Sequence, residues 1–260
     1  MLRLLDARSG RYAEVGFGQP GLLRVSAHLR PRAGDRDWTG VRVLLIADVL
    51  ARAAELGRPQ VLVVAVFGGE PPAERCFAER AAGLLGIHPP VARVSSQVAG
   101  GQADVHVVGR GGADDQLGGV VTRAGDTSVH ATGPAGHGQL ADGELADGDW
   151  LAVRLALLSH PYHRAAGIGD GELARACEVT ARWRNQVAGW AESPSSPVPQ
   201  RVSTALGAAF GDLDTPGALR LLAELAEDAD VPDGARFEAF AFADRVLGLD
   251  LARQVGRPRR

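Results

Sequence analysis

The stretch QVLVVAVF, residues Gln60–Phe67, is a continuous apolar run, which is typical of a strand buried on both faces of a parallel sheet. Two similar segments lie on either side of it in the sequence, Leu22–Leu29 and Ala103–Val108. Helical patterns over Val41–Leu56 and Pro71–Leu85 alternate with these strands. This alternation predicts an α/β fold in which the three strands are parallel neighbours.

Shorter β-like segments flank this core. Leu2–Asp6 and Tyr12–Phe17 enclose Ser9-Gly10, which predicts an N-terminal hairpin. Two further short strands are expected at Gly119–Thr122 and Ser128–Ala131, within a region rich in Gly, Ala and Asp.

The pattern becomes helical beyond Asp149, with a polar, Pro- and Ser-rich connector at Ala191–Gln200. Thr215-Pro216 is expected to cap and open one of these helices. We therefore predict an α/β domain over residues 1–148 and a bundle of about four helices over residues 149–260. The predicted bundle core consists of Leu155, Leu158, Trp183, Leu219, Leu222, Phe240 and Leu247.

The chain contains no lysine, so all 28 of its basic residues are arginine. Schiff-base chemistry and a phosphate-binding lysine are therefore excluded. Arginine still binds phosphate and carboxylate groups, but it stays protonated and cannot act as a base. A net charge of −3 also argues against a strongly basic nucleic-acid-binding protein.

The number of cysteines and the length of the apolar runs indicate in which cellular compartment the protein is expected. Only Cys76 and Cys177 occur, without a Cys-x-x-Cys pair, which favours a reducing cytoplasm and excludes a cysteine-rich zinc site. The apolar runs are far shorter than a membrane span, so no membrane association is expected.

Several stretches, in the same order along the chain, resemble cysteinyl-tRNA synthetases and their relatives, the mycothiol cysteine ligases. The second half of the chain leans toward the ligase branch. This resemblance implies a Rossmann-like core of the class I synthetase type, followed by a helical bundle. The stretches are Gly40–Val61, Ala78–Ser95, Arg154–Arg164 (RLALLSHPYHR), Arg182-Trp183-Arg184, Asp212–Pro216 and Leu247-Gly248-Leu249.

The chain departs from this family at the zinc site. The family holds zinc that contacts the cysteine thiolate, and its first ligand aligns with His28. The family's further zinc ligands lie in a segment that this chain lacks between about Ser96 and Ala103. His106 is the nearest other candidate, but a zinc site requires several ligands in fixed geometry. We therefore favour two partly exposed histidines at strand ends over a metal site.

The two ATP motifs implied by the resemblance have also changed. The first aligns with Asp37-Trp38-Thr39-Gly40, where an aspartate would repel a triphosphate. Thr39 is expected to cap the helix that follows it, and this helix end is expected to offer free N–H groups to an anion. The second motif aligns near Thr127–Gly133, where His130 replaces the lysines of the family. Losing such groups typically costs about 10²–10³ in rate for each group.

A glycine loop at Gly109-Arg110-Gly111-Gly112 follows a predicted strand, at the sheet end where open α/β proteins bind ligands. The candidate binding residues are therefore His28, Asp37, Thr39, Gly40, His106, Gly109, Arg110 and His130. No catalytic residue and no metal ligand is assigned.

Two functions remain open. One is a non-catalytic nucleotide- or aminoacyl-binding protein with a regulatory role, and the other is an ATP-dependent cysteine ligase with a rebuilt active site. The candidate cofactor is ATP, and the expected partner is a small-molecule or aminoacyl-type ligand. The sequence leaves a tRNA or protein partner open.

Overall fold

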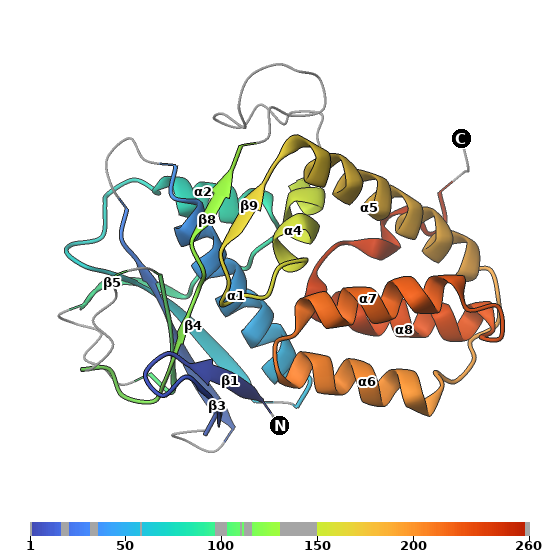
Figure 1. The fold of residues 1–260 in the computed structure, drawn as a ribbon, viewed down its shortest axis with the longest axis horizontal. Helices are drawn as coiled ribbons and strands as arrows, with labels where there is room; N and C mark the ends of the chain where they lie inside the picture. Colours follow the sequence, from blue (N-terminus) through green and yellow to red (C-terminus); the bar gives the residue numbers. More distant parts are fainter. Residues whose placement is uncertain are drawn as a thin grey trace. The chain divides into compact units, whose positions relative to one another are not determined.

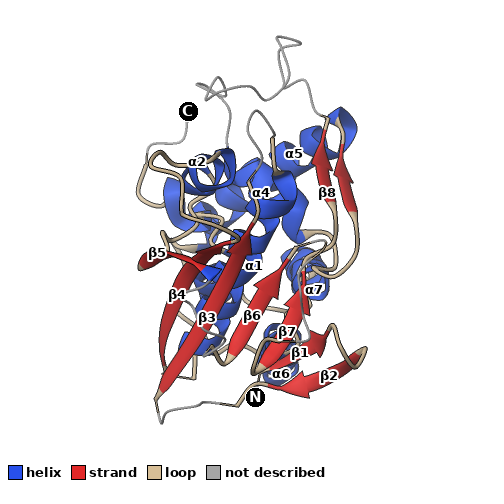
Figure 2. Ribbon diagram, turned by 90° about the vertical axis from the view of Figure 1, so that its left-hand side faces the viewer, coloured by secondary structure: helices blue, strands red, loops and turns tan. Residues whose placement is uncertain are grey.

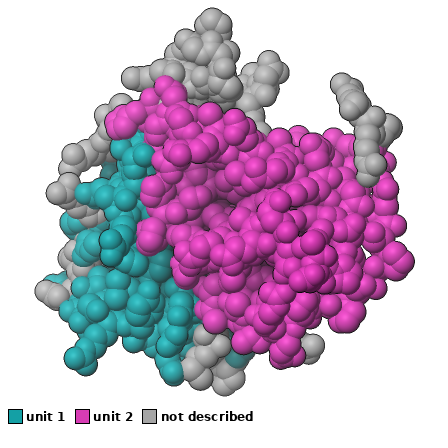
Figure 3. Space-filling view, turned by 45° about the vertical axis from the view of Figure 1, so that its right-hand side comes forward, with its two compact units in different colours: residues 1–129, 162–167, 211–213 teal, residues 130–161, 168–210, 214–260 magenta. Residues whose placement is uncertain are grey.

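The computed structural model describes residues 2–16, 21–31, 36–57, 59–96, 103–109, 111, 116–130 and 150–257. The chain forms two compact units (Figures 1 and 3). Unit 1 comprises Met1–Val129, Tyr162–Gly167 and Gly211–Leu213, and unit 2 comprises His130–Pro161, Ile168–Phe210 and Asp214–Arg260. The predicted domain boundary between residues 148 and 149 lies outside the described residues and stays a prediction.

Unit 1 is built on a five-stranded parallel sheet with the order β5-β4-β3-β6-β7 (Figure 2). The predicted parallel α/β fold is therefore confirmed, and its three expected strands are neighbours. The strands are β3 (Leu22–Leu29), β4 (Gln60–Phe67), β5 (Ala92–Ser95), β6 (Val105–Val108) and β7 (Val120–Arg123).

Helix α1 (Trp38–Glu55) is the central helix of unit 1 and contacts β3, β4, β6 and α2. Every residue from Gly40 to Ala51 in this helix is buried, which is the pattern of a core helix rather than a surface helix. The second helix, α2 (Phe77–Leu84), begins six residues later than its expected start at Pro71. Glu79 accepts a hydrogen bond from the Cys76 backbone (2.9 Å) and fixes this later start.

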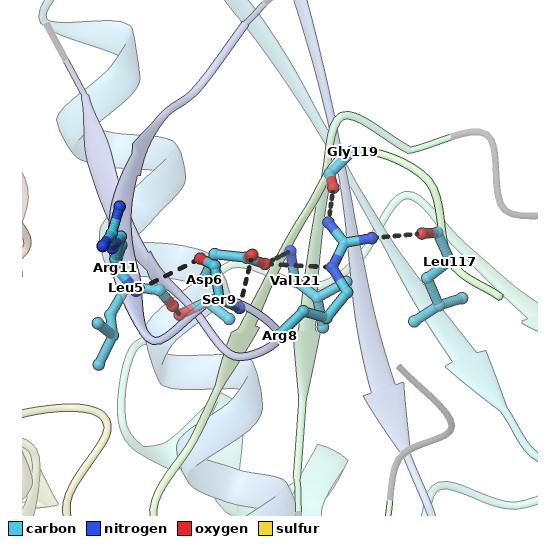
Figure 4. Close-up of polar contacts among 9 residues, drawn as sticks. Leu5, Asp6, Arg8, Ser9, Arg11, Leu117, Gly119 and Val121 are labelled. Carbon is cyan, nitrogen blue, oxygen red and sulfur yellow. Dashed lines mark hydrogen bonds and ion pairs between the residues drawn. The ribbon is translucent and has the colours of Figure 1, made fainter. Parts of the chain in front are cut away.

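The N-terminal hairpin of β1 (Arg3–Asp6) and β2 (Arg11–Glu14) is also confirmed. It attaches to β7, where Ala7 N–H donates to the Val121 carbonyl at 2.7 Å. Arg8 donates from the hairpin turn to the carbonyl groups of Leu117 and Gly119 (Figure 4). These contacts occupy an edge of the sheet that would otherwise present unpaired backbone groups.

Strand β8 (Thr127–Val129) pairs with β9 (Ala166–Ile168), whose first two residues belong to unit 1. Unit 2 is mainly helical, as expected. Its helices are α4 (Trp150–Leu158), α5 (Asp170–Trp190), α6 (Gln200–Gly211), α7 (Thr215–Glu227) and α8 (Asp233–Leu247), with a final 3₁₀ turn η1 (Leu251–Gln254).

Asp214, rather than Thr215, caps α7, because its carboxylate accepts from Gly217 N–H at 3.0 Å. Thr215 instead donates its hydroxyl to the Leu158 carbonyl at 2.7 Å and joins α7 to α4. The expected cap was therefore wrong by one residue. In the described part of the chain, no helix combines the length and the apolarity needed to cross a membrane.

All seven predicted core residues of the bundle are buried, and Leu222 is 0% exposed. We expect Leu222→Ala to lower the free energy of unfolding by about 2–5 kcal/mol, because it removes buried surface and leaves a cavity. Chemical denaturation would measure the change. Leu84→Ala is the control, because Leu84 is 44% exposed and its loss should cost less than about 0.5 kcal/mol. Equal losses for both variants would contradict the assignment.

Candidate ligand site at the carboxyl end of the sheet

Two of the candidate residues meet directly. His28 lies near the carboxyl end of β3, and His106 lies on the neighbouring strand β6, with Ser26 as its register partner. His28 Nε2 is 3.0 Å from His106 Nδ1, so one ring donates a hydrogen bond and the other accepts it. The structure therefore brings together two histidines that are 78 positions apart in the sequence.

Both rings lie in a protected environment. His28 is half-buried, but His106 is 2% exposed, so the expectation of partial exposure was wrong for His106. Burial lowers the pKa of His28 to about 4, with smaller contributions from the nearby charges of His106 and Arg30. At neutral pH the His28 ring is therefore uncharged.

The amino end of α1 is already occupied by a carboxylate. Asp37 caps the helix, and its side chain accepts from Gly40 N–H at 2.8 Å. Trp38 N–H donates to the Arg36 carbonyl at 2.8 Å. The expectation that this end offers free N–H groups to an anion was therefore wrong for these two positions, because residues of the same turn already accept from them.

Thr39 lies inside the first turn of α1 rather than before it. Its hydroxyl accepts from Thr127 N–H at 3.0 Å and so joins α1 to β8. The prediction that Thr39 caps the helix was wrong, because the carboxylate of Asp37 takes that place. Thr39 also lies beside Gly109, where an added Cβ would be 3.4 Å from Thr39 Cγ2, an ordinary contact distance.

Arg123, at the end of β7, is a member of this region that the sequence did not indicate. Its Nη1 donates to the Gly109 carbonyl at 2.9 Å and ties together the ends of two neighbouring strands. Nothing in the local sequence marks this arginine, because its role depends on the pairing of β6 and β7. It places a cation beside the glycine loop.

Arg42 is the second arginine that organises this unit. It is 1% exposed, and its Nη1 donates to Thr127 Oγ1 (3.2 Å) and to the Arg164 carbonyl (2.7 Å). Burial lowers the pKa of Arg42 to about 10, so the side chain is still charged at neutral pH. In the sequence, Arg42 was notable only as part of a stretch that resembles the family. In the structure it joins α1 to two other segments.

Two candidates remain, Arg110 and His130. Arg110 lies outside the described residues. His130 belongs to unit 2, where its side chain is exposed and its backbone N–H donates to the Ile168 carbonyl at 2.8 Å. Among the residues that the structure describes, no group of three or more His, Cys, Asp or Glu side chains is arranged to hold a metal ion.

The cap on α1 requires glycine at position 40. An added Cβ there would overlap the Asp37 carboxylate and lie 3.1 Å from Ala78 Cβ. We expect Gly40→Ala to lower the free energy of unfolding by about 1–3 kcal/mol, through loss of the cap and crowding. Gly83→Ala in α2 is the matched control: its Cβ would meet nothing within 4 Å, so it should be neutral or stabilising. Equal thermal shifts for both variants would contradict this role of Gly40.

Comparison with known proteins gives partial matches. No family model matches the chain. A ligase from Cellulomonas flavigena, L-cysteine:1D-myo-inositol 2-amino-2-deoxy-α-D-glucopyranoside ligase, is 35% identical over 111 residues. The ligase of the same name from Acidothermus cellulolyticus is 36% identical over 107 residues. The matches cover 40% and 41% of this chain and 26% of each relative.

One solved structure, assigned as an arginyl-tRNA synthetase from Campylobacter jejuni, covers 90% of the chain and 91% of its own length. Its TM-score is 0.45 at 9% identity, a likeness too low to support a conclusion about fold or function. The chain thus matches only about a quarter of the length of its ligase relatives. Over about two fifths of its length, the predicted resemblance to the cysteine ligases is confirmed.

Proposed function

We propose that this chain is a non-catalytic relative of the cysteine ligases that binds a nucleotide or aminoacyl-type ligand at the carboxyl end of its sheet. The proposal depends mainly on the Asp37 carboxylate, which accepts from Gly40 N–H at 2.8 Å at the start of α1. A phosphate group at this helix end would meet a negative charge instead of open N–H groups.

The electrostatic argument extends to the rest of the chain. Adenylation places negative charge on the α-phosphate and on the departing pyrophosphate, and enzymes stabilise that charge with fixed cations and N–H donors. This chain has no lysine. Its described cation beside the glycine loop, Arg123, already donates to the Gly109 carbonyl. Binding without turnover therefore fits the described groups better than adenylation.

The second candidate function is an ATP-dependent cysteine ligase with a rebuilt active site. It is favoured by the similarity to ligases over about two fifths of the chain. It also gains support from Arg110, next to Gly109 in the sequence, because an arginine can take over a phosphate contact that a lysine made elsewhere.

Pyrophosphate exchange distinguishes these functions. We expect the purified protein to show no cysteine-dependent exchange of pyrophosphate into ATP, because the groups that stabilise adenylation have been replaced. Binding of ATP and of a stable cysteinyl-adenylate analogue would be measured by calorimetry in the same preparation. Exchange that disappears in Arg110→Ala would establish the ligase, and absence of binding by either compound would contradict both functions.

The role of Asp37 has its own test. Asp37→Asn keeps an oxygen that can accept from Gly40 N–H but removes the negative charge. We expect this variant to bind ATP about tenfold more tightly, because one repulsive charge near the phosphates corresponds to about 1.4 kcal/mol. Asp230→Asn, at an exposed position in unit 2, is the matched control and should leave ATP affinity unchanged. Equal affinities in all three proteins would place the phosphates away from Asp37.

The proposal also includes the cellular compartment in which the protein acts. Cys76 and Cys177 are both free thiols. We place the protein in the cytoplasm, where such thiols stay reduced.

A further inference from the structure

The contact between His28 and His106 leaves one ring nitrogen available. His28 uses Nε2 for the contact with His106 Nδ1. Within the described residues this is the only hydrogen bond of the His28 ring, and Nδ1 is not among the buried atoms without a partner. Since His28 is half-buried, Nδ1 is the ring atom that a small molecule can reach.

The chemistry of the pair limits what this atom can bind. If His28 Nε2 carries the proton, Nδ1 is an acceptor; if His106 Nδ1 carries it, His28 Nδ1 is a donor. A hydroxyl group suits both arrangements, because it donates one hydrogen bond and accepts others. A thiol is a weak donor and a weak acceptor, and a methyl group is neither.

Of the neighbouring charges, that of Arg30 is exposed to solvent, and those at the amino ends of the strands pair with each other. At the amino ends of the same two strands, Arg24 and Asp104 form an ion pair at 3.1 Å. Ser26, which is 7% exposed, lies between this pair and His28 on β3. The uncharged His28 ring therefore follows an ion pair whose charges compensate each other, an arrangement that suits an uncharged ligand group.

We propose that His28 Nδ1 binds the hydroxyl group of a small molecule held at the carboxyl end of the sheet, with His106 as the positioning residue. This inference rests on the proposed function, because it names the kind of group that the same site selects. His106 fixes the ring orientation and the tautomer of His28 through the 3.0 Å contact and does not touch the ligand itself.

Three probes that differ in one atom or group test this directly: the seryl, cysteinyl and alanyl forms of sulfamoyl adenosine, which are stable analogues of aminoacyl-adenylates. We expect the seryl form to bind about tenfold more tightly than the alanyl form, the usual worth of one hydrogen bond. The cysteinyl form should resemble the alanyl form. Equal affinities for the seryl and alanyl forms would overturn the inference.

Matched variants separate contact from positioning. His28→Gln keeps a polar atom where Nε2 meets His106 but has none at Nδ1, so the preference for the seryl form should disappear. His28→Asn keeps a polar atom near Nδ1 and should retain part of the preference. His106→Leu should lose it and His106→Asn should restore part of it, because the asparagine amide lies where Nδ1 was. A preference unaffected in both His28→Gln and His106→Leu would overturn the assignment.

A measurement without nucleotide keeps this inference separate from the proposed function. The imidazole ¹⁵N signals of His28 would be followed by NMR during titration with free L-serine and, separately, with L-alanine. We expect serine alone to shift them. If the sulfamoyl adenosines fail to bind and serine still shifts His28, the nucleotide proposal fails and the hydroxyl site stands. Equal responses to both amino acids, or zinc binding by the pair, would overturn the hydroxyl site.

Discussion

Replacement of Arg154 by methionine is expected to lower the free energy of unfolding by about 3–5 kcal/mol. Arg154 is 0% exposed in unit 2, and its Nε donates to the Leu247 carbonyl at 2.6 Å. Methionine would fill much of the volume but would leave this carbonyl at the end of α8 without its donor. Chemical denaturation at neutral pH would measure the loss.

The cost is large because Arg154 belongs to a group of buried charges that holds the last turn of the bundle. Asp244 accepts from Leu249 N–H (2.7 Å) and Leu251 N–H (2.8 Å). Burial raises the pKa of Asp244, while these N–H groups and the charge of Arg154 oppose the rise. Without Arg154 the Asp244 carboxylate loses part of its compensation, so the variant loses more than one hydrogen bond.

Arg184 holds the same turn from α5. It is 4% exposed and donates to the carbonyl groups of Leu249 (2.7 Å) and Asp250 (3.1 Å). The control is Arg182→Met. Arg182 is exposed and lies two residues from Arg184 on α5, so this variant should lose less than about 0.5 kcal/mol of unfolding free energy. If Arg154→Met and Arg182→Met were equally stable, the buried group would not hold the turn.

The two long strands of the sheet could be predicted because each depends mainly on its own sequence. Gln60–Phe67 and Leu22–Leu29 were predicted to the residue, since continuous apolar runs of that length fit a buried parallel strand. Strand β5 (Ala92–Ser95) was missed, because its four residues, ARVS, carry no such run. It is a strand because β4 supplies backbone partners, which is information that the segment itself does not contain.

Helix starts were harder to predict, because capping depends on which of several polar residues takes the cap. At the start of α1 the sequence offers both Asp37 and Thr39, and the hydroxyl of Thr39 is used by Thr127 N–H instead. At α7 the same competition occurs between Asp214 and Thr215, whose hydroxyl binds the Leu158 carbonyl. In both cases the tertiary contact decided which residue capped the helix.

The candidate site also combines features that the sequence predicts with features that only the structure gives. His28 and His106 were named through family resemblance, but their 3.0 Å contact follows from the pairing of β3 and β6, which only the structure gives. Arg123 was not named at all, since its bond to Gly109 depends on the pairing of β6 with β7. Residue identity therefore suggested the members of the site, whereas strand order determined which of them meet.

The burial of His28 should also make the protein sensitive to acid. The pKa of His28 is about 4 in the folded chain, against 6.5 for an unperturbed histidine. Between these values the unfolded chain binds a proton that the folded chain does not, so stability falls as the pH is lowered from about 6.5 to about 4. Below the folded value both states are protonated and this contribution stays constant.

The size of the effect follows from the same shift. One pKa unit corresponds to about 1.4 kcal/mol, so the shift would change the free energy of unfolding by roughly 3 kcal/mol for a fully buried ring. Because the His28 ring is half-buried and partly in contact with solvent, we expect about 2 kcal/mol. Denaturation curves recorded from pH 7.5 to pH 3.5 would show the loss. His28→Gln has no titrating group at this position, so its loss of stability over this pH range should be about 2 kcal/mol smaller than that of the unmodified protein. His130→Gln, at an exposed side chain, controls for removal of a histidine. Parallel curves for the unmodified protein and His28→Gln would show that the ring of His28 is not held in its neutral form by the fold.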